Sequence, residues 1–229
     1  MNDPVLKILK QYLISKKEEE NYDYLSKDEK DRFRLENDDD ARYYYKNLHM
    51  TESDALFADV IVSFWTPYRW LLEKKTGWNA YKTDKSLKSL IYQIETNKKT
   101  DYNDKIRQVN SSIEDFARIC YSKGNFMLLP KRMMNNERYK LTEDKIDLTL
   151  YECFENGKLS KYFESDDKLK EWIKRQNLNI LFKNNIIARS EINWFVPSVN
   201  KKLFSEMSAE EICEYLEKAT QFIKQRNEM

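Results

Sequence analysis

The chain has 229 residues and a formal net charge of +1, with 41% hydrophobic and 34% charged residues. Its three glycines and one histidine exclude the glycine-rich phosphate loops of P-loop and dinucleotide-binding proteins, and the zinc motif H-E-x-x-H. Because basic and acidic residues nearly balance, no global field attracts a polyanion, and any binding of nucleic acid must be local.

The length suits one large domain or two small ones. Apolar residues at helical spacing and the lack of a linker favour a mainly α protein, a single-domain helical bundle over residues 1–229. A chain of this size buries about 70% of its unfolded surface on folding, and 31 aromatic residues are available for a core. We expect residues 1–48 to be a loosely attached N-terminal region, because residues 16–40 are rich in charge and poor in large aliphatic side chains.

Apolar residues at helical spacing predict the first helices. One is expected over residues 5–13 and another from Thr51 onward. The second would bury Leu56, Phe57, Val60, Ile61 and Phe64. Thr66 and Pro67 favour a new helix start, since proline fits the first turn, and Gly77 should end that helix.

Further helices are predicted over residues 87–94, 106–120, 142–154 and 166–176. The last helix is the most clearly marked, because Ser208 and Glu211 form a capping box in front of a continuous apolar stripe. Residues 126–129 read as a short apolar strand or anchor. A small β-hairpin is allowed near residues 179–199, where β-branched and aromatic residues precede Pro197.

Three widely spaced cysteines, Cys120, Cys153 and Cys213, lie among apolar neighbours. They indicate reduced, buried thiols and a cytoplasmic protein. The N-terminus lacks the pattern of a signal peptide, and no apolar run approaches the ~20 residues that span a bilayer. We therefore expect no membrane association.

The segment SFWTPYRW concentrates aromatic residues around an arginine. Its Trp65, Tyr68 and Arg69 cannot all share the face that buries Phe64, so they are candidate binding residues. A bundle core with polar aromatic groups at its rim explains the same pattern.

A basic, amide-rich loop covers residues 123–140. Gly124 and Asn125 suit a left-handed turn, and the donors that follow Pro130 could reach phosphate groups. The candidate binding residues here are Gly124, Asn125, Lys131, Arg132, Asn135 and Arg138. A connection buried by its own apolar residues is the alternative interpretation.

Part of this loop resembles the G-N-[LF]-x-x-L…N stretch of HNH-type endonuclease domains in modification-dependent restriction enzymes. The matching positions are Gly124, Asn125, Phe126, Leu129 and Asn135 or Asn136. No histidine occurs between Tyr81 and Lys123, where such domains place the metal and base residues. The resemblance thus implies at most a degenerate relative without the water-activating group.

A longer resemblance is to an uncharacterised bacterial family with the segments D-x-x-x-S-F-W-T, I-G-N-F-x-x-[LP]-P and D-x-T-L. The matching positions are Asp59 with Ser63–Thr66, Gly124–Phe126 with Pro130, and Asp147 with Thr149 and Leu150. Lys123 stands where that family has an apolar residue. The family implies no particular activity.

The only histidine, His49, has no serine elbow or nearby cysteine to work with. We therefore assign no catalytic, cofactor or metal residues, and expect a non-catalytic bacterial protein that binds a protein partner and belongs to a mobile or defence-related locus. The alternative is a nucleic-acid-binding or degenerate nuclease-like protein that uses the basic loop. A metal enzyme built from dispersed carboxylates is a third interpretation.

Overall fold

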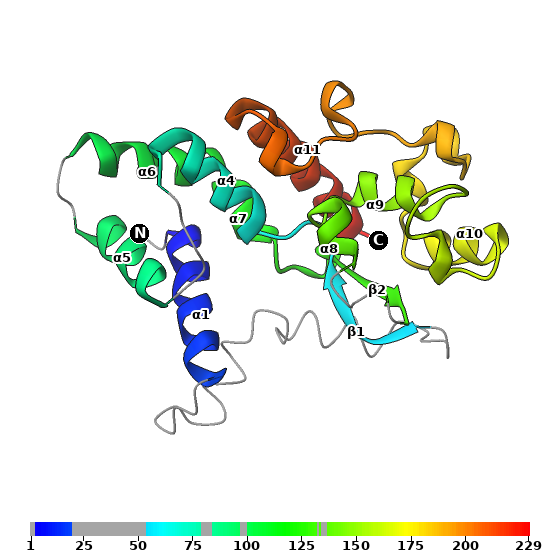
Figure 1. The fold of residues 1–229 in the computed structure, drawn as a ribbon, viewed down its shortest axis with the longest axis horizontal. Coiled ribbons are helices and arrows are strands. Elements are labelled where there is room, and N and C mark those ends of the chain that lie inside the picture. Colours follow the sequence, from blue (N-terminus) through cyan, green and yellow to red (C-terminus); the bar gives the residue numbers. More distant parts are fainter. Residues whose placement is uncertain (1–2, 20–53, 79–83, 97–99, 132, 134–136) are drawn as a thin grey trace.

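A computed structural model describes residues 3–19, 54–78, 84–96, 100–131, 133 and 137–229. The predicted fold class is confirmed: the described chain is mainly helical, with one small antiparallel sheet (Figure 1). Its α-helices are α1 (Pro4–Glu19), α4 (Trp65–Thr76), α5 (Asp84–Glu95), α6 (Asp101–Ser112), α7 (Glu114–Ile119), α8 (Glu137–Thr142), α9 (Ile146–Cys153), α10 (Asp166–Arg175) and α11 (Ala209–Asn227).

The sheet joins two strands that are far apart in sequence. Strand β1 (Asp54–Val60) pairs antiparallel with β2 (Phe126–Pro130), with Val60 opposite Phe126 and a register irregularity between Asp54 and Ala58. The prediction of a helix from Thr51 through Phe64 is therefore wrong for the described residues 54–60. The apolar spacing fits a helical period, but pairing with a distant strand overrides that local preference.

Strand β2 lies in the interior, and all five of its residues are buried. Its edge away from β1 is completed by side chains of the α10 region instead of a third strand. Gln176 Oε1 accepts from Leu128 N–H at 2.8 Å, and Trp172 Nε1 donates to the Leu128 carbonyl at 2.7 Å. Buried strand edges need such partners, so α10 and β2 depend on each other.

Helix α1 belongs to the core. Val5, Ile8 and Leu9 are buried, and α1 packs against α5 and α7. With α5 it lies at one end of the molecule (Figure 1). Of the predicted loosely attached region, residues 20–48 lie outside the described residues, as does His49.

Helix α4 ends as predicted. Gly77 adopts a left-handed backbone (φ 70°), and its N–H donates to the Glu73 carbonyl, the arrangement in which glycine is the favoured residue. The single helix predicted over residues 106–120 is instead α6 and α7. They meet at Ile113, whose φ of −122° and ψ of 12° leave the helical range.

Helix α11 begins with the predicted capping box. The Ser208 hydroxyl accepts from Glu211 N–H at 3.1 Å, and the Glu211 carboxylate accepts from Ser208 N–H at 2.7 Å. The helix packs against α7, α4 and the 3₁₀ turn η2 (Lys123–Asn125). In Figure 1 it lies above the sheet, in the middle part of the molecule.

The hairpin allowed near residues 179–199 is reduced to a single antiparallel bridge, between Phe182 and Ile192. Short 3₁₀ turns fill most of this stretch: η4 (Asn179–Leu181), η5 (Lys183–Asn185), η6 (Arg189–Glu191) and η7 (Pro197–Val199). Asn184 and Asn185 turn the chain with φ values of 53° and 57°. Two more 3₁₀ turns, η3 (Ser160–Tyr162) and η8 (Phe204–Glu206), lie in other connections.

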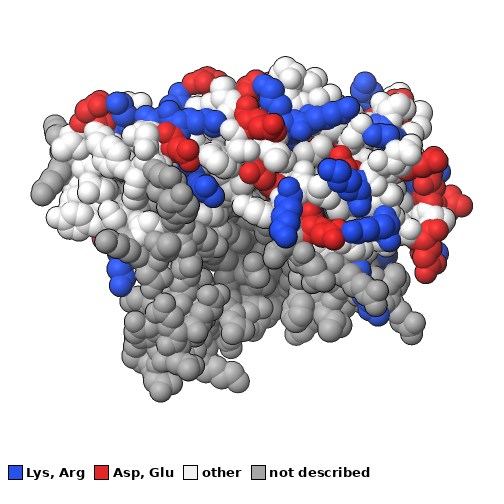
Figure 2. Space-filling view, viewed as in Figure 1, with Lys and Arg blue, Asp and Glu red and all other residues white. Residues whose placement is uncertain are grey.

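Charged side chains of both signs are interspersed over the described part of the face in Figure 2. This face therefore offers no broad region of one charge. Among the described helices, none has the length and apolar character needed to cross a membrane.

Candidate functional site

The aromatic segment at the start of α4 is mostly interior. Tyr68 is fully buried, and its hydroxyl donates to Asn110 Oδ1 at 2.9 Å. Trp65 is half-buried, with its ring 5.8 Å from that of Tyr12. Arg69 is half-buried, and its guanidinium lies 4.6 Å from the centre of the Trp70 ring. Only Trp65 and Arg69 of the three candidates thus reach the surface.

Gly124 and Asn125 are buried and hold segments of the chain together. The Asn125 side chain donates to the carbonyls of Val62 (2.9 Å) and Cys120 (2.6 Å) and accepts from Val62 N–H at 3.1 Å. Gly124 N–H donates to Asn227 Oδ1 at 2.6 Å, and Arg226 donates to the Gly124 carbonyl. In this structure the polar groups of Gly124 and Asn125 form hydrogen bonds within the protein and stabilise the fold.

Arg138 is the centre of a buried polar cluster. Its guanidinium donates to Asp59 Oδ2 at 2.8 Å and lies 3.3 Å from Asp144 Oδ1. It also donates to the carbonyls of Val60, Ile61 and Asp144 at 2.9, 2.8 and 3.2 Å, while its Nε donates to Thr149 Oγ1 at 3.2 Å. Arg138, Asp59, Asp144 and Thr149 are named the Arg138 cluster below.

The three segments that carry the longer family resemblance meet around this cluster. Asp59 lies near the end of β1, shortly before the S-F-W-T segment. Asn125 links the G-N-F segment to Val62, and Thr149 lies on α9. Asp147 from the third segment is also buried, where it accepts from Tyr215 Oη at 2.9 Å and Phe195 N–H at 3.2 Å. These motif residues therefore join elements far apart in sequence.

The backbone between α8 and α9 makes the Arg138 cluster compact. Glu143 and Asp144 both have left-handed backbones, with φ values of 47° and 61°. This uncommon conformation folds the carbonyl and carboxylate of Asp144 back onto Arg138. Burial raises the pKa of Asp144 to about 6, against the lowering effect of the Arg138 charge and with a further rise from Asp59.

The remaining loop candidates divide in two. Lys131 is exposed directly after β2, whereas Arg132 and Asn135 lie outside the described residues. Arg138 is 2% exposed, and its donors are directed to groups of the protein itself. Of the described basic residues at 131–138, only Lys131 is therefore available to a ligand in this structure.

Lys145 and Asp147 form a second buried polar centre. Lys145 Nζ donates to the carbonyls of Lys202 (2.6 Å) and Val199 (3.4 Å), and burial lowers its pKa. Burial raises the pKa of the Asp147 carboxyl. Because both groups are enclosed by α9, α11 and the connection between them, they stabilise this part of the fold.

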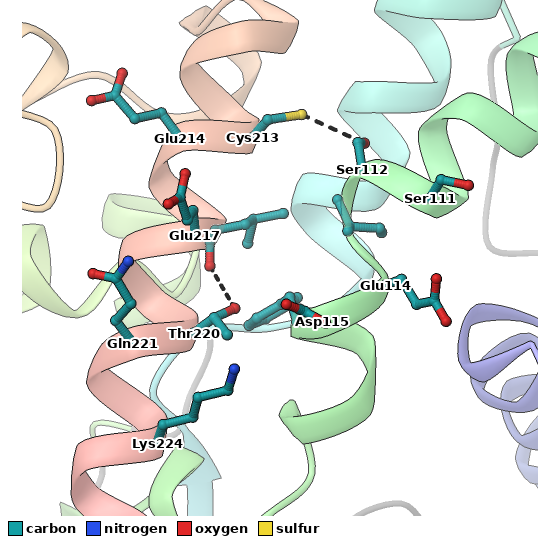
Figure 3. A pocket seen from close by; sticks show the side chains of 13 residues that line it. Ser111, Ser112, Glu114, Asp115, Cys213, Glu214, Glu217, Thr220, Gln221 and Lys224 are labelled. Carbon is teal, nitrogen blue, oxygen red and sulfur yellow. Dashed lines mark hydrogen bonds between the residues drawn. The ribbon is translucent and has the colours of Figure 1, made fainter.

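A groove separates α11 from the junction of α6 and α7, and none of the candidate binding residues from the sequence lines it (Figure 3). The cavity has a volume of about 630 Å³. Glu214, Glu217, Gln221 and Lys224 line it from α11 and Asp115 lines it from α7. In Figure 3, Glu214 and Gln221 extend from the side of α11 away from Asp115. The buried apolar residues Ile113, Phe116 and Leu216 also contribute to its lining. We call this the α11 groove.

Negative charge dominates the α11 groove. Its lining includes Glu114, Asp115, Glu214 and Glu217 but one lysine, Lys224. Glu114 pairs with Arg118, while no ion pair with a described residue is found for the other three carboxylates. Cys213 at the upper end places its Sγ 3.6 Å from Ser112 Oγ. Within the described chain, no group of three or more His, Cys, Asp or Glu residues is arranged to hold a metal ion.

No family model, curated protein or solved structure matches this chain.

Proposed function

We propose that this protein is a non-catalytic binding protein that holds a basic segment of a partner protein in the α11 groove. The observation that supports this most directly is the combination of an open cavity, apolar lining residues and three carboxylates that form no ion pair with a described residue. Interfaces between proteins commonly pair an apolar centre with a polar rim.

Charge indicates the chemistry of the partner. Asp115, Glu214 and Glu217 are not neutralised by described residues, so a segment that carries lysine or arginine would complete their ion pairs. Complementary charges steer association and select partners. Salt screens the attraction between exposed charges, with a Debye length of about 10 Å at 0.1 M. Binding should therefore weaken as ionic strength rises.

The contacts of the buried basic residues support a binding role rather than a catalytic one. Arg138, Lys145 and Arg226 direct their donors to backbone carbonyls. We place the protein in the cytoplasm, in keeping with its free thiols: Cys120 and Cys153 are buried and Cys213 is partly exposed.

A photo-crosslinking amino acid at Gln221, which is exposed in the groove, would test the proposal in host-cell extract. The same amino acid at Ser89, exposed on α5, is the control. We expect a discrete protein adduct at position 221 that is absent at position 89. The adduct identifies the partner for binding measurements with purified proteins.

The double variant Glu214→Lys and Glu217→Lys should then lower the affinity at least tenfold, which corresponds to about 1.4 kcal/mol. Glu164→Lys makes a charge change at an exposed site before α10 and should leave the affinity unchanged. Equal affinity of the double variant and the unaltered protein would reject the groove as the binding site.

Nucleic-acid binding through the basic loop is the second candidate, and the exposed Lys131 at the end of β2 favours it. Titration with labelled DNA and RNA should then show salt-dependent binding that weakens in Lys131→Ala and Arg132→Ala. Substitution of Arg138 is uninformative here, because it disturbs the fold. An affinity for DNA and RNA that is unchanged by both substitutions would exclude the loop as the binding site.

A further inference from the structure

Two cations lie against the ring of Tyr151, a partly exposed residue of α9. The Arg189 guanidinium lies 4.0 Å from the centre of the Tyr151 ring, and Lys201 Nζ lies 4.9 Å from it. The Trp194 ring is 5.6 Å from the Tyr151 ring, at 47°. Tyr151, Arg189, Trp194 and Lys201 are named the Tyr151 cluster.

Neither cation has an acidic partner among the described residues. Arg189 Nη1 donates to the backbone carbonyl of Glu155 at 3.3 Å, and its buried Nε has no hydrogen-bond partner there. The nearby Glu191 carboxylate instead accepts from Ser190 Oγ at 3.1 Å. Arg189 and Lys201 thus place two positive charges beside the Tyr151 phenol, and no described carboxylate neutralises them.

Both cations act on the phenolic oxygen. A hydrogen bond from Lys201 lowers the pKa of Tyr151, and the charge of Arg189 lowers it further. The lowered pKa means that negative charge is favoured at this point of the surface. An anionic oxygen from a ligand would meet the same two cations.

The geometry points to a binding site for a phosphomonoester group, held by Arg189 and Lys201 with the Tyr151 hydroxyl as a third hydrogen-bond donor. This site is separate from the α11 groove and does not depend on the function proposed for it. Arginine and lysine bind phosphate oxygens through charge-assisted hydrogen bonds.

The arrangement favours an anion over a stacked nucleobase. A guanidinium 4.0 Å above the Tyr151 ring is in van der Waals contact with it, so that face is not open to a base. The charge favours a monoester over a diester. A phosphomonoester carries up to two negative charges at neutral pH, which match the two cations that have no acidic partner among the described residues, whereas each phosphodiester carries one.

Calorimetric titration of the full chain with phenyl phosphate at pH 7.5 tests the site. We expect saturable 1:1 binding that weakens at least tenfold in both Arg189→Gln and Lys201→Gln. Lys88→Gln removes an exposed lysine from α5 and should bind as the unaltered protein does. Tyr151→Phe keeps the ring and should weaken binding by a smaller factor, about threefold, through loss of one neutral hydrogen bond.

Two further measurements are specific to a dianion. Affinity should rise from pH 5 to pH 7, because the second pKa of the phosphate is about 6. The absorbance titration of Tyr151, obtained by subtraction of Tyr151→Phe, should shift to higher pH when phenyl phosphate is bound, because a nearby anion disfavours phenolate.

A phosphoserine peptide with glycine flanks distinguishes two sources of the group. Tighter binding than phenyl phosphate would assign it to phosphorylated proteins, and equal binding to small phosphomonoesters; both results support the site. Absence of saturable binding, or equal weakening in Lys88→Gln, would overturn it. Tighter binding of dimethyl phosphate or single-stranded DNA would also overturn it and assign the cations to phosphodiesters.

Discussion

Arg138 carries a permanent charge in the interior, and its neighbours show how this is tolerated. Removing a charge from water costs several kcal/mol, which is recovered only when its donors find partners. Arg138 has two carboxylates, three carbonyls and one hydroxyl within reach. Since these groups come from β1, the residues after it, the α8–α9 turn and α9, one side chain links several elements.

Arg138→Met should therefore lower the free energy of unfolding by about 3–5 kcal/mol, because it leaves buried carbonyls and Asp144 without a donor. Arg118→Ala removes an exposed arginine from an (i, i+4) pair with Glu114 and should cost less than about 0.5 kcal/mol. Urea denaturation measures both. A loss below about 1 kcal/mol for Arg138→Met would contradict the role given to Arg138.

Asp144 should make stability depend on pH. Burial raises its pKa from 3.8 to about 6, so the folded state binds this proton more tightly than the unfolded chain does. The Asp144 contribution thus falls as pH rises from about 4 to about 6 and is constant above, with a full change of at most about 3 kcal/mol.

Asp144→Asn cannot titrate and should remove this component. Denaturation of both proteins between pH 4 and pH 7 should show the variant gaining stability relative to the unaltered protein as pH rises. A stability difference that is constant over this range would contradict the assignment.

At the scale of elements, α11 approaches the 3₁₀ turn η2 so closely that only glycine fits between them. A Cβ on Gly124 would lie 2.3 Å from the Ile223 carbonyl oxygen, which belongs to the α11 backbone. That oxygen can move only if the helix moves. The close approach also allows the hydrogen bond from Gly124 N–H to Asn227.

Gly124→Ala should displace the end of α11 and lower stability by about 1–3 kcal/mol. Hydrogen exchange should accelerate in the last turns of α11 and in η2. In Gly77→Ala, the new Cβ meets nothing within 4 Å, although the positive φ strains the turn. It should destabilise the protein without faster exchange in α11. Unchanged exchange in α11 of Gly124→Ala would contradict this account.

Helices with local signals were predictable, and pairings between distant segments were not. Ser208 and Glu211 marked the start of α11, and Gly77 marked the end of α4, because caps and glycine turns act within a few residues. The sequence predicts a helix at strand β1, whose partner, β2, lies more than sixty residues further along. Spacing of apolar residues contains no information about that partner.

The same limit applies to the functional residues. Arg138 and Asn125 stood out for their chemistry, but only the fold shows that their donors are satisfied inside the protein. The α11 groove combines residues about a hundred positions apart. Its sole sequence signal is the excess of acids after Leu203, six against three basic residues.

At the scale of the whole molecule, one hydrophobic core extends from α1 to α11 and includes two of the three cysteines. Burial raises the pKa of the Cys120 and Cys153 thiols, whereas Cys213 is partly exposed at the α11 groove. Thiolates are the reactive form of cysteine. The core therefore protects two thiols from reagents in solution.

A thiol reagent such as Ellman's reagent should modify Cys213 within minutes and leave Cys120 and Cys153 unmodified until the protein is unfolded. Mass spectrometry of peptides identifies the modified residue, and Cys213→Ser should abolish the fast phase. All three cysteines should react in 6 M guanidinium chloride. Rapid native modification of Cys120 or Cys153 would contradict the burial of that residue.

Arg226 forms hydrogen bonds with segments of the chain that are synthesised well before it. Its guanidinium donates to the carbonyls of Gly124, Phe126 and Gln176. On a ribosome that adds about 5–20 residues per second, the 102 residues between Gly124 and Arg226 take roughly 5–20 s to synthesise. Until then these carbonyls lack the arginine that pairs with them in the finished protein. The segments around these carbonyls therefore cannot form all of their native hydrogen bonds before α11 has been synthesised.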